Sequence, residues 1–148
     1  MNYLIPGPEL DIVFKALVAA ILGYLVGLER NLAGHQAGAR TFSLVASGSA
    51  LFTALGFQVF APQSAEAASR IAQNILTGVG FLGGGLILRE GVSVRGLTTA
   101  AGIWAMAGVG MSIGSGFYLV GVLVSVLVVV VLALGRLIKP GPSAPSDD

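Results

Sequence analysis

The C-terminal part of the chain reads LTTAAGIWAMAGVGMSIGSGFYLVGVLVSVLVVVVLALGRLI over residues 97–138, and Arg136 is its one charged residue. Gly114-Ser115-Gly116 divides this stretch into two apolar segments. Each segment is close to the roughly 20 residues with which a helix crosses a bilayer core. The three-residue break leaves room only for a tight connection. The stretch therefore predicts a hairpin of two membrane-spanning helices.

Three further apolar segments precede this hairpin, so the predicted spans are residues 12–28, 41–60, 71–88, 97–113 and 117–138. The chain is 55% hydrophobic and 10% charged, with a mean hydropathy of +0.88, which is too little charge to cover a soluble domain of 148 residues. We expect an all-α membrane protein, a compact bundle of about five transmembrane helices over residues 1–138. Residues 139–148 have the composition of a disordered tail.

The basic residues are distributed unequally between the two sides of this bundle. One side would carry Arg30, Arg40, Arg89, Arg95, Arg136 and Lys139, and the other only Lys15 and Arg70. The positive-inside rule then places the N-terminus outside and the C-terminus in the cytoplasm. Asp11 and Lys15 are one helical turn apart and could form an ion pair, although Lys15 could equally extend to the interface alone.

Polar side chains recur at helical spacing near an arginine in three of the segments. The sets are Arg70, Gln73, Asn74 and Thr77; Arg95, Thr98 and Thr99; and Arg40, Ser43 and Ser47. Because polar groups are costly at membrane depth, we expect them to face protein and to form a polar network or site. Helix packing is the alternative interpretation, and it is stronger for Thr98 and Thr99 than for the amides and Arg70.

Glu29 ends the first segment beside Arg30. It is interpreted as an ion-pair anchor within reach of Arg40, Arg89 or Arg95, with contact to a cation as the alternative. His35 is most simply an exposed loop residue that could also sense pH.

Glycines recur four residues apart in three segments, which lets helices approach closely. The pairs are Gly23 and Gly27, Gly80 and Gly84, and Gly110 and Gly114. They favour a tight bundle and a homo-oligomer, most simply a dimer, although packing within one chain would explain them too.

Several function classes have little support. The chain has no Cys and one His, which excludes thiolate metal sites and Cys nucleophiles, and we expect no metal site and no enzyme. Gly78, Gly80 and Gly83 match a dinucleotide-binding pattern, but the match lies inside an apolar segment without the required strand, so no cofactor is expected. A net charge of +1 gives no basis for nucleic-acid binding.

The sequence resembles the membrane domain of the MgtC/SapB family from about residue 12 to residue 118. The resemblance lies in GYLVGLER (23–30), AGART (37–41), RIAQ (70–73), TGVGFLG (77–83), VRGLTTAA (94–101) and Trp104. Longer members carry a soluble C-terminal domain, and this chain looks like the short SapB-like branch. Glycine at position 84 stands where the family often has alanine. The site residues that match family motifs are Glu29, Arg40, Arg70, Gln73, Thr77, Arg95, Thr98, Thr99 and Trp104.

The resemblance implies a bacterial inner-membrane protein linked to magnesium homeostasis, to growth in low magnesium and, in pathogens, to survival in macrophages. It also implies a regulator that acts through helix contacts, and a link to restraint of the F-type ATP synthase. The alternative function is a small transporter or channel for Mg²⁺ or another ion. Mg²⁺ prefers carboxylate oxygens, however, and arginines at helix ends suit an anion or a lipid phosphate better.

Overall fold

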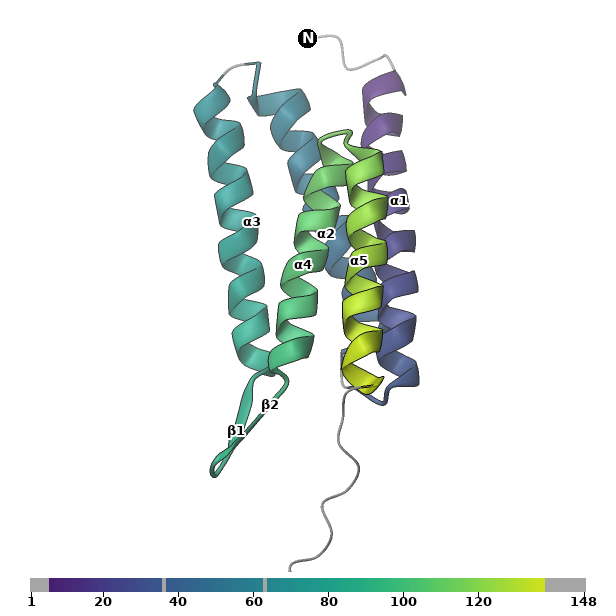
Figure 1. Ribbon diagram of the computed structural model, residues 1–148. Coiled ribbons are helices and arrows are strands. Elements are labelled where there is room, and N and C mark those ends of the chain that lie inside the picture. The colour runs from purple at the N-terminus through teal and green to yellow at the C-terminus, as the bar shows by residue number, and fades with distance from the viewer. Residues whose placement is uncertain (1–5, 36, 63, 138–148) are drawn as a thin grey trace, which may run out of the picture.

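The computed structural model describes residues 6–35, 37–62 and 64–137 and shows a bundle of α-helices (Figure 1). The helices are α1 (Pro6–Leu32), α2 (Ala39–Leu55), α3 (Ala65–Leu86), α4 (Leu97–Gly114) and α5 (Tyr118–Leu137). A single π-helical turn, η1 (Gly56–Phe60), extends α2. The predicted all-α membrane bundle is therefore confirmed. Residues 139–148 lie outside the described residues.

Four helical segments of the described chain are long and apolar enough to cross a membrane. They are Gly7–Leu32, Ala39–Phe60, Leu97–Gly114 and Tyr118–Gly135. The fifth expected span, α3, has the necessary length but begins with Glu66, Arg70, Gln73 and Asn74, which lower its hydropathy. It runs beside the other helices of the bundle (Figure 1).

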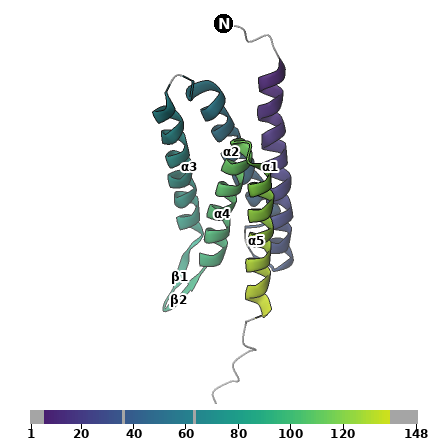
Figure 2. The same ribbon diagram turned by 45° about the horizontal axis from the view of Figure 1, so that its top comes forward.

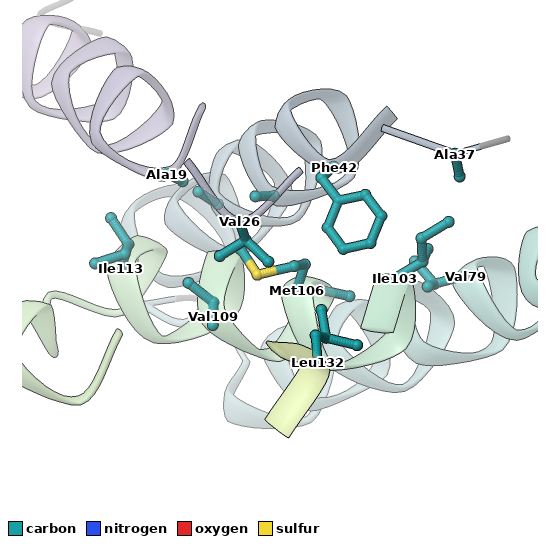
Figure 3. Close-up of a cluster of buried hydrophobic side chains, with 13 residues drawn as sticks. Ala19, Val26, Ala37, Phe42, Val79, Ile103, Met106, Val109, Ile113 and Leu132 are labelled. Atoms are coloured by element: carbon teal, nitrogen blue, oxygen red, sulfur yellow. The ribbon is translucent and has the colours of Figure 1, made fainter. Parts of the chain in front are cut away.

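The core lies where α1, α2, α4 and α5 meet (Figure 3). Phe42, Ile103 and Met106 are buried at its centre, with Val26 from α1 and Leu132 from α5 beside them. Small residues such as Ala46 and Ala50 fill the rest, so the helix backbones come close together. Close packing of this kind supplies most of the attraction between helices in lipid.

Glycines bring α2 against both of its neighbours. A Cβ at Gly23 would lie 2.5 Å from the carbonyl oxygen of Phe42, and one at Gly27 would overlap the backbone of Ala39. On α4, a Cβ at Gly110 or Gly114 would overlap backbone atoms of α2 in the same way. These four glycines therefore pack within one chain.

Helix α3 stands at the side of the bundle. Figures 1 and 2 both show it separated from α1 and α5, with α4 as its neighbour. Val79 and Gly83 face α4, where a Cβ at Gly83 would be in ordinary contact with Ala100, 3.6 Å away. A neighbouring face of α3 is open, since a Cβ at Gly80 or Gly84 would have no atom within 4 Å.

A short β-hairpin connects α3 to α4. Strand β1 (Leu88–Glu90) pairs antiparallel with β2 (Ser93–Arg95), and Leu88 is opposite Arg95. The expected third helix over 71–88 was too long at its C-terminal end, because the backbone becomes extended at Ile87 and Leu88 enters the strand. Gly91, with φ +61°, makes the turn.

Candidate functional site

One end of the bundle carries most of the arginines, and we call it the arginine end. Helices α1, α3 and α5 finish there, α2 and α4 begin there, and the hairpin projects from it (Figure 1). By sequence position it includes Arg30, Arg40, Arg89 and Arg95. The charge asymmetry expected from the sequence therefore corresponds to one end of the folded chain.

A buried ion pair lies at this end. Arg30 is 2% exposed, and its Nε and Nη2 atoms donate to the two carboxylate oxygens of Glu29 over 2.5 and 2.9 Å. Nη2 also lies 3.5 Å from the carbonyl oxygen of Leu132, and Nη1 lies 3.5 Å from Nε2 of His35. A two-point pair of this geometry is among the stronger polar contacts in proteins. The pair ties the end of α1 to α5.

Glu29 pairs with its neighbour Arg30, although the sequence suggested Arg40, Arg89 or Arg95 as partners. Adjacent residues on a helix point about 100° apart, so spacing arguments do not pair them. The arginine side chain is long enough to bridge that angle. Burial of both groups against α5 is a tertiary feature with no local sequence signal.

A cavity of about 230 Å³ opens beside this pair, and we call it the arginine-end cavity. Three segments form it: the α1–α2 connection, the end of α3 with β1, and the end of β2 with the start of α4. Its lining residues are Gly34, His35, Leu86, Leu88, Arg95, Gly96 and Thr99. Two of the sequence-predicted site residues, Arg95 and Thr99, thus meet at one cavity.

A second group of predicted site residues lies elsewhere. Arg70, Gln73, Asn74 and Thr77, which we call the α3 stripe, are exposed on α3. Arg70 pairs with Glu66 over 2.7 Å, with the two side chains 71% and 73% exposed, and the Thr77 hydroxyl donates to the carbonyl of Gln73. A single chain neither buries the stripe nor brings it to Arg95 and Thr99. Its functional role stays a prediction.

A largely apolar groove of about 540 Å³ runs between α2 and α3, and we call it the α2–α3 groove. Asn74 and Ser49 are the polar residues of its lining. The remaining lining residues are Leu44, Val45, Gly48, Phe52, Ile71, Ile75, Gly78, Val79 and Leu82. An amide thus lies at the edge of a surface otherwise suited to hydrocarbon or to another helix.

A profile of the MgtC family matches residues 16–140, which includes both sites. The chain belongs to the MgtC family. It is 46% identical over 104 residues to the protein MgtC of Salmonella typhimurium LT2, covering 70% of this chain and 43% of that protein. It is 42% identical over 127 residues to the Escherichia coli K12 protein named "Putative magnesium transporter YhiD", covering 82% of this chain and 59% of that protein.

A cyanobacterial relative is similar over more of its own length. The protein SrpB of Synechococcus elongatus is 42% identical over 132 residues, covering 82% of this chain and 72% of SrpB. The chain therefore spans between about two fifths and three quarters of these relatives. No solved structure matches it.

Three other residues marked by the MgtC family motifs are exposed in the fold. Arg40 lies in the first turn of α2 with no ion-pair partner in the described part of the chain, Thr98 lies at the start of α4, and Trp104 is 53% exposed. None of the three lines the arginine-end cavity. The structure therefore does not gather all of the motif residues into one site.

A further polar cluster joins Asp11 and Lys15, which precede the region that the MgtC family profile matches, to Gln58, which lies within it. Asp11 and Lys15 form the expected ion pair over 2.8 Å, and Nε2 of Gln58 also donates to Asp11 over 2.6 Å. Gln58 comes from η1, 47 residues along the chain from Asp11. Helical spacing predicted the pair, but no local signal could have found the amide.

Proposed function

We propose that this chain is a regulatory protein of the bacterial inner membrane that takes part in magnesium homeostasis and acts through contacts made by α3. Support for the magnesium link comes from its MgtC family membership and from the name of its relative YhiD. The proposal assigns no reaction to the chain. Four apolar helices of sufficient length support a multi-pass location.

The open face of α3 is the observation on which the contact mechanism rests. Gln73 and Asn74 carry amides that hydrocarbon does not satisfy, and polar groups in membrane helices are usually covered by protein. Gly80 and Gly84 lie along the same helix with nothing near them in the chain. A polar stripe with open glycines beside it matches the surfaces by which membrane helices associate.

We propose a second copy of the chain as the occupant of this face. An amide is both a donor and an acceptor, so Asn74 on one copy can bond to Asn74 on another across a two-fold axis. Interhelical hydrogen bonds contribute about 0.6 to 2 kcal/mol each in membranes.

Enlarging an open glycine tests the mechanism. Gly84→Leu should abolish co-purification of two differently tagged copies from native membranes, and should reduce the rescue of growth in low magnesium by a plasmid-borne copy. Gly135→Leu makes the same change at an open glycine of α5 and should leave both readouts intact. The proposal fails if Gly84→Leu is as harmless as Gly135→Leu, or if only a single copy is ever recovered.

If the co-purification recovers another membrane protein bound through α3 and no second copy, the contact is heteromeric and the dimer is abandoned. The family link to the F-type ATP synthase makes that enzyme the first partner to test for in the same purification. Co-purification of the synthase that is lost with Gly84→Leu would support regulation by contact and would remove the two-fold dimer from the account.

Ion transport is the second candidate, and the name of YhiD favours it. Mg²⁺ binds through carboxylates and waters, whereas Glu29 here is held by Arg30 in two hydrogen bonds. Within the described residues, no group of three His, Asp or Glu side chains could hold a metal. Mg²⁺ flux into proteoliposomes that disappears with Glu29→Gln would overturn our order of preference.

A further inference from the structure

The arginine-end cavity has the features of an anion site. We infer that it binds a phosphate group, presented either by free phosphate or by the headgroup of an anionic lipid. Its volume of about 230 Å³ is well above the roughly 10–15 Å³ that admits one water. It lies at the end of the helices, where lipid headgroups and dissolved ions both have access.

Thr99 is the first reason for this inference. Thr99 lines the cavity and is only 5% exposed, and its hydroxyl makes no hydrogen bond within the described part of the chain. A hydroxyl in this position can both donate and accept a hydrogen bond. The buried hydroxyl of Ser125 donates to the carbonyl of Gly121, whereas the hydroxyl of Thr53 is buried without a partner at a position that does not line this cavity. A ligand in the cavity would satisfy Thr99.

The charge around the cavity is the second reason. Arg95 lines it, and its cross-strand partner Leu88 lines it too, because residues directly opposite in a β-ladder share a face. The N-terminus of α4 begins two residues after Arg95, and the free amide groups and dipole of a helix start favour negative charge. Behind His35 lies Arg30, 3.5 Å from the imidazole. The groups that face the cavity are therefore cationic or neutral.

The lining also argues against other ligands. No carboxylate lines the cavity in the described part of the chain, and the nearby Glu29 is occupied by Arg30. A divalent cation would thus meet arginines without the oxygen ligands that it needs. His35 is the one aromatic ring in the lining, which is too little to sandwich a nucleobase. Arginine, a hydroxyl and a helix N-terminus together are the groups that recognise phosphate.

Gly96 fixes the relative position of these groups. Its φ is +84°, and a Cβ there would overlap the carbonyl oxygen of Leu86. Glycine is therefore required for the hairpin to return against the end of α3. That return places Arg95 and the first turn of α4 on the same wall of the cavity.

Binding is tested with the full chain in two parallel arms. In the first arm, inorganic phosphate is titrated calorimetrically into protein in an uncharged detergent. In the second arm, native mass spectrometry measures whether the protein retains phosphatidylglycerol in preference to phosphatidylcholine. Arg95→Gln and Thr99→Val should each weaken the binding that is observed by about tenfold, the value of one hydrogen bond to a charged group.

Two controls separate the cavity from general positive charge. Arg89→Gln removes the same charge from the hairpin at a residue that does not line the cavity, and it should change binding by less than about twofold. Thr99→Ser keeps the hydroxyl and should keep binding, which distinguishes a lost contact from a fold damaged by Thr99→Val.

Saturable binding in either arm with this pattern of variants supports the inference, and the arm that responds identifies the source of the phosphate group. The inference is overturned if neither arm shows binding. It is equally overturned if Arg89→Gln weakens binding as much as Arg95→Gln, since attraction would then be diffuse.

Discussion

Removing the charge of Glu29 should destabilise the protein far more than its position at a helix end suggests. Glu29→Gln leaves the Arg30 guanidinium, which is 2% exposed, without its anion. Breaking a buried pair by removing one partner costs about 3–5 kcal/mol. We expect the lower end of that range, about 3 kcal/mol, because glutamine keeps one acceptor and Arg30 still contacts His35 and the carbonyl of Leu132.

The assay is thermal unfolding of the purified chain in a mild detergent, followed by circular dichroism. At about 2–4 °C per kcal/mol for a domain of this size, the expected fall in Tm is about 6–12 °C. The exposed pair on α3 supplies a matched control, since Glu66 is 73% exposed in its contact with Arg70. Exposed pairs contribute about 0–1 kcal/mol, so Glu66→Gln should lower Tm by less than about 4 °C.

A double variant distinguishes the loss of the Glu29–Arg30 ion pair from a loss of side-chain packing. Glu29→Leu combined with Arg30→Met replaces both charges with apolar groups of similar length, and such replacements are often neutral or stabilising. The double variant should therefore unfold at a higher temperature than Glu29→Gln. The reasoning is refuted if Glu29→Gln melts with the wild type, or if Glu66→Gln is equally damaging.

Two further predictions concern packing and the polar cluster near the N-terminus. Gly110→Val should lower the free energy of unfolding by at least the roughly 1–3 kcal/mol of an overpacked core, because a Cβ at Gly110 would overlap the backbone of Ala46. Size-exclusion chromatography should show aggregation of this variant but not of Gly108→Val, which changes an open position of the same helix. Gln58→Leu removes the amide that donates to Asp11 and should destabilise the chain by about 1–2 kcal/mol in the thermal unfolding assay. An unchanged Tm would show that the Asp11–Lys15 pair stabilises this end of the bundle without Gln58.

The helices of this protein could be predicted from its sequence because membrane spans depend on long apolar runs. The connection between α3 and α4 could not. The ten residues between the two helices, 87–96, are compatible with a plain turn or with a hairpin. The sequence has no local signal for the register in which Leu88 lies opposite Arg95. The hairpin forms one wall of the arginine-end cavity.

The sites were predicted less completely than the helices. Periodicity correctly placed Gln73, Asn74 and Thr77 on one face of α3, yet periodicity cannot say what that face meets. The expectation that these side chains face protein did not specify whether that protein is the same chain or a second copy. A surface between two copies covers polar side chains as well as the interior of one copy does. The position of α3 at the side of the bundle is the observation that favours the surface between copies.

Cysteine cross-linking tests the role of α3 most directly, because the chain contains no cysteine of its own. Asn74→Cys in native membranes should form a disulfide-linked dimer on mild oxidation, whereas Val126→Cys, on the exposed face of α5, should remain monomeric. A monomer for both variants, or equal cross-linking of both, would contradict a specific contact through α3.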